Sequence, residues 1–187
     1  MTRWIFLFLL ISLGIQRLLE LRLSARNERR ILELGGSEHA PGQFKVMRLL
    51  HIAWFLVMIA EVFGLQRPFQ PALALVASLV FLAGQALRYA AIHTLGERWT
   101  VRVMTLPAAK PVSQGIYRFI RHPNYLGVIL EISAVPLLHS AYLTAISFSI
   151  ANALLLAWRI HTEEMALKDQ NNYEQVFAGR PRFLPKL

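Results

Sequence analysis

A polar segment from Gly115 to Gly127 carries the clearest chemical signal in the sequence, reading Gly-Ile-Tyr-Arg-Phe-Ile-Arg-His-Pro-Asn-Tyr-Leu-Gly. A proline disfavours helix at the preceding residue and suits the first turn of a helix, so we expect an extended His122 and a helix beginning at Pro123 or Asn124. The free N–H groups and positive dipole end of a helix start attract anions. Two arginines would strengthen that attraction: Arg118 and Arg121. The segment indicates either a carboxylate or phosphate site or a headgroup anchor at a membrane surface.

A second group of polar residues lies near the C-terminus. Asn152, Arg159 and Glu163 are separated by steps of seven and four, which places them on one face of a helix. The same spacing also permits a simple i,i+4 ion pair between Arg159 and Glu163. Glu164 and Lys168 repeat this spacing, and we expect them to pair with each other.

Two carboxylates fall within apolar segments. Asn124, Gly127 and Glu131 share one helix face, and an ionised side chain in hydrocarbon costs about 2.5 to 3.5 kcal/mol. We therefore expect Glu131 to face a polar cavity or a charged partner. Glu61 lies near the outer end of its apolar segment, where a structural role at the interface is expected.

Several common chemistries lack their residues. The chain has no cysteine, which excludes disulfides, thiolate nucleophiles, Cys-ligated zinc and iron–sulfur clusters. Its ten glycines form neither a dinucleotide-binding G-x-G-x-x-G nor a P-loop. Its histidines lack the HExxH spacing of zinc enzymes, so we expect no metal site.

The elements that carry these residues are predicted to span a membrane. Of 187 residues, 55% are hydrophobic and only 17% charged, and the mean hydropathy is +0.42, whereas soluble domains carry about 25% charged residues. We predict an all-α integral membrane protein with one domain, residues 1–187, and five transmembrane helices. The predicted spans are residues 4–23, 48–66, 71–92, 124–138 and 140–160. The first could instead be a signal peptide.

Charge predicts the orientation of these spans. The net charge is +9, and with five spans, 18 of the 20 basic residues fall on one side of the membrane. The positive-inside rule makes that side cytoplasmic, with the N-terminus outside and the C-terminus inside. The last two spans should form a helical hairpin. The basic excess then indicates contact with membrane lipids, and we expect no nucleic-acid partner.

The 115–127 segment, with Arg159 and the Glu163–Glu164 pair, resembles the isoprenylcysteine carboxyl methyltransferase (ICMT) family of membrane S-adenosylmethionine enzymes. The N-terminal half resembles a bacterial branch that methylates alkylpyrones and alkylresorcinols. That likeness rests on Gln16–Glu20, Arg26–Glu28, Gly35–His39, Leu50 and His51. Ala40 and Pro41 depart from it, because a tyrosine is expected after His39.

The resemblance implies S-adenosylmethionine as cofactor and assigns roles to named residues. Its cofactor region covers residues 98–127 and 159–187. The implied cofactor-binding residues are Lys110, Pro111, Val112, Tyr117, His122, Pro123, Asn124, Tyr125 and Glu163. Arg159 would be catalytic and face the acceptor, and Glu131 would contact the substrate.

The expected reaction is methyl transfer to an oxygen of a lipid-tailed acceptor, either a prenylcysteine-like carboxylate or the hydroxyl of an alkylpyrone or alkylresorcinol. A carboxylate or an acidic enol needs only a cation to hold it, whereas a resorcinol would benefit from a base, with Glu131 and His161 as candidates. The expected location is the bacterial inner membrane, with the active site facing the cytoplasm. The alternatives are a phospholipid-type methyltransferase, an NADPH enzyme resembling sterol reductases, and a non-enzymatic membrane scaffold.

Overall fold

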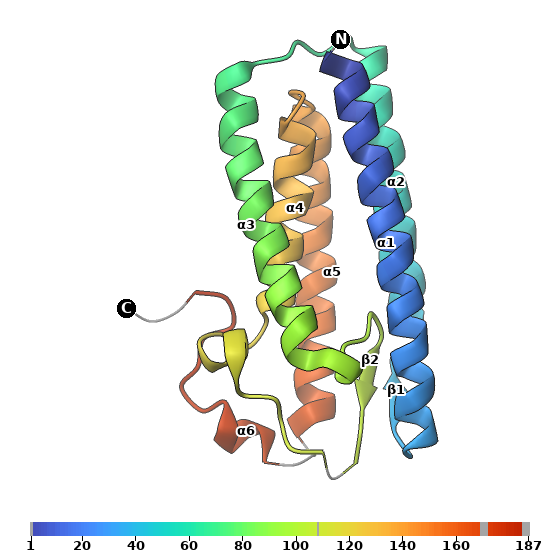
Figure 1. Cartoon of the computed structure of the whole chain (residues 1–187), viewed down its shortest axis with the longest axis vertical. Coiled ribbons are helices and arrows are strands. Elements are labelled where there is room, and N and C mark those ends of the chain that lie inside the picture. The colour runs from blue at the N-terminus through green and yellow to red at the C-terminus, as the bar shows by residue number, and fades with distance from the viewer. Residues whose placement is uncertain (1, 108, 169–171, 185–187) are drawn as a thin grey trace.

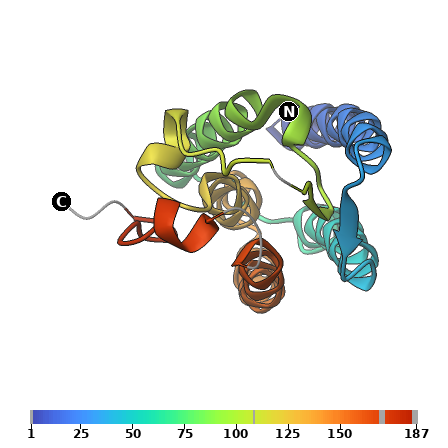
Figure 2. The ribbon, with the colours of Figure 1, turned by 90° about the horizontal axis from the view of Figure 1, so that it is seen from below.

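Five helices form an antiparallel bundle in the computed structural model, which describes residues 2–107, 109–168 and 172–184. The bundle helices are α1 (Thr2–Glu33), α2 (Gly42–Gly64), α3 (Pro71–Leu95), α4 (Pro123–Leu137) and α5 (Tyr142–Lys168). They run alternately down and up the long axis (Figure 1). Seen from below, α1 and α2 lie on one side, and α4 lies against α3 and α5 on the other (Figure 2).

Short elements complete the lower end of the bundle. Strands β1 (Ser37–His39) and β2 (Val103–Thr105) pair antiparallel, and the remaining pieces are η1 (Gly96–Arg98), η2 (Gly115–Arg118) and α6 (Tyr173–Val176). The all-α fold class is therefore confirmed, and the short two-stranded sheet is an addition that the expectation did not contain. A strand of three residues is too short to show the alternating pattern that predicts strands.

Four of the helices are long and apolar enough to cross a membrane: Thr2–Glu33, Gly42–Gly64, Pro71–Arg98 and Tyr142–Lys168. Helix α4 has 15 residues, fewer than the roughly 20 that a span requires. Four of the five predicted spans thus correspond to helices that could cross a membrane, and the fifth, α4, does not meet that length. Helices α4 and α5 do form the expected hairpin, in which Ser140 takes a positive φ of 57° at the turn.

The upper half of the bundle holds an apolar core. Its buried members come from α1 (Phe6, Leu10, Leu13), α2 (Trp54, Met58, Val62), α4 (Ile132, Val135) and the turn after α4 (Ala141). Helix α1 therefore packs as part of the bundle, which favours a span over the signal-peptide alternative. Large apolar side chains also cover the outside of the helices, among them Phe8, Leu56, Leu79, Ile146 and Leu154.

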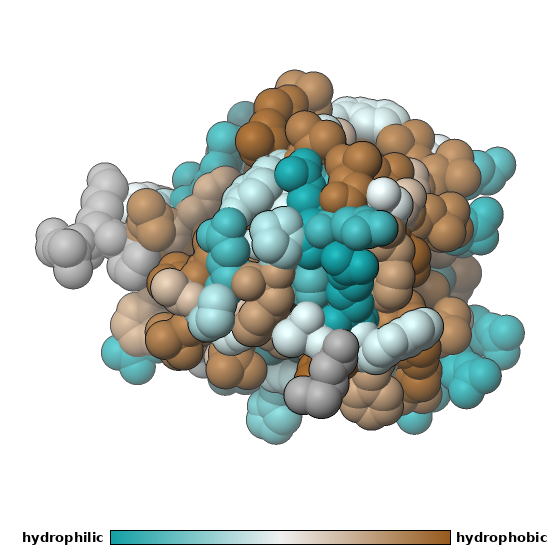
Figure 3. Space-filling view, turned by 90° about the horizontal axis from the view of Figure 1, so that it is seen from above, coloured by the Kyte–Doolittle hydropathy of each residue, from teal (hydrophilic) through white to brown (hydrophobic). Residues whose placement is uncertain are grey.

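The upper end differs from these apolar flanks. Seen from above, hydrophilic surface gathers in its middle and hydrophobic surface surrounds it (Figure 3). Just inside this end, the Glu61 carboxylate accepts hydrogen bonds from the backbone N–H groups of Leu143 (3.1 Å) and Thr144 (2.7 Å) at the start of α5. Arg67 also donates to it, at 2.9 Å. These contacts support the structural role expected for Glu61, because a carboxylate stabilises the positive end of a helix.

Candidate active site

A cavity of about 480 Å³ opens among the lower halves of the helices and the loops beneath them. All but two of the predicted site residues line it: Lys110, Pro111, Val112, Tyr117, His122, Asn124, Tyr125, Arg159 and Glu163. Pro123 is buried behind them in the first turn of α4. Glu131 does not line the cavity and belongs to the ion cluster described below. The structure thus brings together residues that are up to 53 positions apart, from Lys110 to Glu163.

The cavity has a polar end and an apolar reach. The polar end is formed by residues 109–125, by the lower part of α5 and by α6. The apolar reach runs between helices and is lined by Leu18 and Leu21 of α1, Met47, Ile52 and Phe55 of α2, Val128 of α4, and Leu155 and Leu156 of α5. Its volume falls in the range of about 300 to 1,000 Å³ typical of small-molecule sites.

Helices α4 and α5 meet at the polar end through one short hydrogen bond. The Tyr125 hydroxyl donates to Oε2 of Glu163 at 2.5 Å. One turn away, the Arg159 guanidinium lies 5.8 Å from the centre of the Tyr125 ring and donates to the Val101 carbonyl at 2.7 Å. Arg159 and Glu163 therefore share the expected helix face but bind different groups. The alternative of a simple Arg159–Glu163 ion pair receives no support.

Two buried polar atoms at this face have no hydrogen-bond partner among the described residues. They are Nε of Arg159 and Oδ1 of Asn152. Both side chains line the cavity and are nearly inaccessible, at 3% and 2% exposure. Because unpaired buried polar atoms are costly, these two atoms mark a locally destabilised part of the cavity wall.

Helix α4 starts where the sequence predicts, but the carboxylate beside its start, Glu164, has partners that the sequence did not predict. Helix α4 begins at Pro123 after a non-helical His122, whose ring stacks on Tyr125 at 5.5 Å. His122 Nε2 lies 3.0 Å from Oε1 of Glu164, and Arg182 also donates to that carboxylate, at 2.5 Å. The prediction that Glu164 pairs with Lys168 is therefore wrong. Lys168 pairs with Glu174 instead, at 3.2 Å.

The two arginines expected to strengthen the anion site have separate contacts. Arg121 lines the cavity, but its guanidinium contacts Glu164 at 3.4 Å and the Arg180 carbonyl at 2.8 Å. Arg118 is exposed and lies over the Phe119 ring at 4.8 Å. Lys110, a third cation predicted near this site, also lines the cavity. The Arg98 side chain donates to the Lys110 backbone carbonyl at 2.5 Å.

Tyr117, in η2, lies at the polar end and is buried. Burial, reinforced by the nearby Glu163 charge, raises the pKa of the Tyr117 hydroxyl well above its usual range. The hydroxyl therefore stays neutral at physiological pH and can donate a hydrogen bond.

The lower half of α1 positions the loop that closes the cavity. Asn27 donates to the carbonyls of Gly96 (3.2 Å) and Trp99 (2.8 Å), and the Val101 N–H donates to the Ser24 hydroxyl at 2.8 Å. Sequence reasoning used Asn27 only within the Arg26–Glu28 part of the resemblance and gave Ser24 and Asn27 no structural role. The available signal was the three-residue spacing of Ser24 and Asn27 on one helix face, within a segment too polar for the hydrocarbon.

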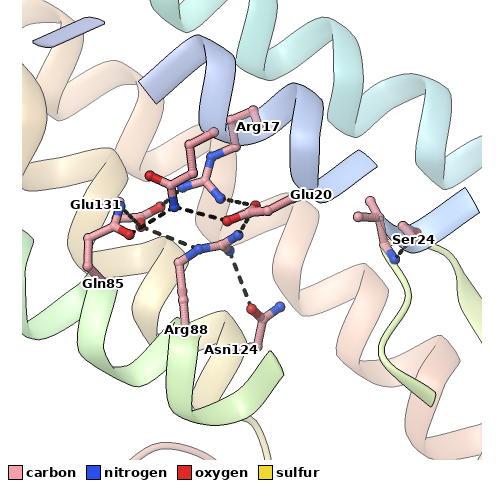
Figure 4. Close-up of polar contacts among 9 residues, drawn as sticks. Arg17, Glu20, Ser24, Gln85, Arg88, Asn124 and Glu131 are labelled. Carbon is pink, nitrogen blue, oxygen red and sulfur yellow. Dashed lines mark hydrogen bonds and ion pairs between the residues drawn. The ribbon is translucent and has the colours of Figure 1, made fainter. Parts of the chain in front are cut away.

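A buried ion cluster next to the cavity joins α1, α3 and α4 (Figure 4). It contains two arginines and two glutamates: Arg17, Glu20, Arg88 and Glu131. Arg88 binds Glu20 at 2.5 Å and lies 3.3 Å from Glu131, and Arg17 also pairs with Glu131. Glu131 thus has charged partners, which was one of the two expectations for it. The opposite charges are equal in number, as burial in a membrane requires.

Comparison with known proteins adds the family. The model of the isoprenylcysteine carboxyl methyltransferase (ICMT) family matches residues 72–169, slightly more than half of the chain. The chain belongs to this family. The ICMT match runs from α3 to the end of α5, so it contains Arg159, Glu163 and the whole 115–127 segment.

Individual relatives agree with this assignment. The chain is 37% identical to the uncharacterized protein YpbQ of Bacillus subtilis, over 89% of this chain and 96% of that one. It is 30% identical to protein-S-isoprenylcysteine O-methyltransferase B of Arabidopsis thaliana over 54% of this chain and 49% of that protein. The structure of the eukaryotic intramembrane Ras methyltransferase ICMT is similar in fold, with a TM-score of 0.52 at 21% identity, covering 74% of this chain and 49% of that one. The chain thus spans about half of each named methyltransferase.

The ICMT-family match also divides the cavity. The polar end is formed mainly by residues inside the matched range, including Lys110, Tyr125 and Glu163. The walls that α1 and α2 contribute to the apolar reach lie outside it. The protein is therefore a membrane methyltransferase by family, with an apolar wall built from helices that the family model does not cover.

Proposed function

We propose that this protein is an S-adenosylmethionine-dependent O-methyltransferase that acts on a lipid-tailed acceptor. The observation that carries the proposal is the single cavity that joins a polar end to an apolar reach between helices. A hydrophilic cofactor and a lipid tail need those two environments, and they must meet where the methyl group is transferred. When bound, the cofactor supplies a methyl group already activated on a sulfonium.

The polar end has the groups that such a cofactor needs. The first turn of α4 leaves N–H groups free for a carboxylate, with Lys110 as a nearby cation. The faces of Tyr117 and Tyr125 suit a sulfonium, and Glu163 can accept from hydroxyl or amino groups. His122, Pro123 and Asn124 shape the turn, while Pro111 and Val112 line the facing loop.

Arg159 is the residue proposed to hold the acceptor. The Arg159 side chain lines the cavity between the polar end and the apolar reach, where its guanidinium can bind a carboxylate or an oxyanion. Methyl transfer depends on aligning the acceptor oxygen with the methyl carbon and the sulfur. Fixing the oxygen with a guanidinium that is itself anchored on Val101 would provide that alignment. Glu131 would act only indirectly, because it holds Arg17 and Arg88.

The acceptor is proposed to be either a prenylcysteine-like carboxylate or the hydroxyl of an alkylpyrone or alkylresorcinol. Its tail would enter sideways between helices, while the cofactor enters from the end that carries the loops. We place the protein in a bacterial inner membrane with that end in the cytoplasm.

Equilibrium binding to the detergent-purified full chain tests the proposal. S-adenosylmethionine should bind and NADPH should not, which separates a methyltransferase from an enzyme resembling sterol reductases. Methyl transfer from labelled S-adenosylmethionine to farnesylcysteine and alkylresorcinol probes then tests the acceptor. Absence of measurable S-adenosylmethionine binding would overturn the proposal.

A further inference from the structure

One histidine that lines the cavity has a ring nitrogen to which the proposed function assigns no role. His51 of α2 lines the cavity, and its Nδ1 lies 2.8 Å from the Met47 carbonyl one turn earlier in the helix. A carbonyl can only accept, so Nδ1 carries the hydrogen. The neutral ring then keeps a lone pair on Nε2, on the side of the ring turned away from the Met47 carbonyl.

The packing of α2 against α5 fixes the position of His51 along the bundle axis. Gln43 donates to Thr162 at 2.8 Å near the bottom, and Thr144 donates to Glu61 at 2.7 Å near the top. This antiparallel register places His51 level with the α5 turn that holds Asn152 and Leu155, about one turn above Arg159. His51 therefore lies within the apolar reach, about one turn from its junction with the polar end at Arg159.

The two bases expected from the sequence do not occupy this place. Glu131 lies outside the cavity lining and is paired with Arg17 and Arg88. His161 is exposed on the outer side of α5 and lines a separate surface depression. His122, which does line the cavity, is occupied by Glu164. Among the described residues that line the cavity, His51 is thus the histidine whose ring contacts no carboxylate, because its one hydrogen bond goes to a backbone carbonyl.

We propose that His51 is the general base that removes the proton from an acceptor hydroxyl during methyl transfer. This inference rests on the proposed function and selects one of its acceptor classes, a phenol with a lipid tail such as an alkylresorcinol. As the oxygen forms its bond to the methyl carbon, the carbon–sulfur bond breaks and its electron pair stays on sulfur. The hydroxyl proton moves to Nε2 of His51, and the resulting imidazolium later releases it to water.

The charges around His51 fit an oxygen that becomes negative. Besides His51, the ionisable side chains that the five bundle helices contribute to the cavity lining are Arg17 and Glu20 of α1, Arg48 of α2, Arg88 of α3, Tyr125 of α4, and Arg159 and Glu163 of α5. The glutamates are already engaged, Glu20 by Arg17 and Arg88 and Glu163 by Tyr125. Arginine therefore dominates the field that a developing oxyanion would meet.

The test compares two variants with two acceptors in the full-length protein. His51→Ala removes the ring, whereas His51→Asn keeps an amide donor near the Nδ1 position and removes only the base. An alkylresorcinol and N-acetyl-S-farnesylcysteine serve as the hydroxyl and carboxylate acceptors, and His161→Ala is the matched control. With the alkylresorcinol at pH 7, both His51 variants should lose about 10²- to 10⁴-fold in kcat. The loss should shrink as the pH approaches about 10, where the phenol ionises without help.

A second readout needs no methyl transfer. A lipid-tailed nitrophenol absorbs visible light only as its phenolate, so its spectrum in the cofactor-free protein reports where the proton resides. At a pH below its own pKa, the bound probe should be more ionised in the wild type and in His161→Ala than in either His51 variant. Binding of S-adenosylmethionine should be unchanged in all variants, which shows that each has folded.

The outcomes separate this inference from the proposed function. Full alkylresorcinol turnover in His51→Asn, or a loss that is equal for both acceptors and independent of pH, would overturn the role of His51 alone. A wild type that binds S-adenosylmethionine but methylates only the carboxylate, or neither acceptor, would also refute the hydroxyl acceptor. A wild type that does not bind S-adenosylmethionine refutes the proposed function itself.

Discussion

Arg159 and Glu163 occupy successive turns of α5, yet their contacts point them to different ligands. Arg159 is anchored on the Val101 carbonyl and has a free Nε, whereas Glu163 accepts from Tyr125 at the polar end. Substitutions at two residues so close in sequence would ordinarily be expected to cause the same functional defect. Their separate partners predict separate defects.

Glu163→Ala should weaken S-adenosylmethionine binding by about 10- to 100-fold, the value of a hydrogen bond to a charged group. Arg159→Ala should leave that affinity nearly unchanged and lower kcat by about 10²- to 10³-fold, because it removes the group proposed to hold the acceptor oxygen. Calorimetric binding and methyl-transfer kinetics measure the two effects. Arg26→Ala, an exposed change on α1, is the control. If both site variants lost cofactor affinity to the same extent, the division of roles would be wrong.

Local rules predicted part of this site. The His122–Pro123 boundary follows from the steric effect of proline, and the shared face of Asn152, Arg159 and Glu163 follows from helical periodicity; the structure confirms both. The expected pairing of Glu164 failed because an i,i+4 pair is worth only about 0.2 to 0.5 kcal/mol. The returning chain brings Arg182 and His122 to the same carboxylate, and sequence spacing carries no information on that long-range contact.

At the scale of elements, α3 and α4 approach closely because glycines face each other. A Cβ on Gly127 would lie 2.8 Å from the Gly84 carbonyl oxygen and 2.5 Å from Cγ of Arg88. Gly127→Ala should therefore push the helices apart and lower stability by about 1 to 3 kcal/mol, the usual effect of overpacking. Thermal unfolding in detergent measures it.

Gly64→Ala is the matched control for this substitution, because nothing lies within 4 Å of a Cβ added at Gly64. It should be neutral or slightly stabilising, since alanine is the better helix former. If Gly127→Ala unfolded at the same temperature as the Gly64→Ala control, the two helices could separate without loss of stability.

The loop that covers the cavity depends on α1 through Asn27. Its amide donates to two carbonyls, those of Gly96 and Trp99, so Asn27→Ala leaves both without that donor and should cost about 1 to 3 kcal/mol locally. Hydrogen exchange of residues 96–102 should speed up, while exchange in the upper core stays unchanged. Arg26→Ala again serves as the control. Uniform acceleration along the whole chain would instead indicate general destabilisation.

The elements themselves were predictable to different degrees. Apolar length and periodicity predicted the five helices, and α1 continues as a charged helix beyond its span to Glu33, as expected from the glycines that follow it. Strands β1 and β2 were missed because each pairs with a segment more than 60 residues away, and three residues carry no pattern of their own. Their pairing ties the end of α1 to the loop that carries Val101, so a small element with no sequence signal helps to position the cavity.

At the scale of the whole molecule, charge serves two purposes. Arg17 and Arg88 were counted with the basic residues that mark the cytoplasmic side, but the structure places them, Arg17 half-buried and Arg88 buried, in a neutral cluster with Glu20 and Glu131. They tie α1, α3 and α4 together and do not report orientation. The other basic residues near the lower loops still favour that end as the cytoplasmic one.

The absence of cysteine makes the orientation directly testable. Single cysteines at exposed positions, Gln70→Cys at the upper end and Gln114→Cys and Gln175→Cys at the lower end, introduce unique labelling sites. In intact bacterial cells a membrane-impermeant maleimide should label Gln70→Cys and spare the other two, which should react only after the membrane is opened. The lower pair must behave alike, because the backbone N–H groups of Arg121 and His122 bond to the carbonyls of Pro181 and Arg182, at 3.0 Å each. Labelling of the lower pair in intact cells would invert the proposed orientation, and a split between them would mean that α4 does not carry the chain back across the membrane.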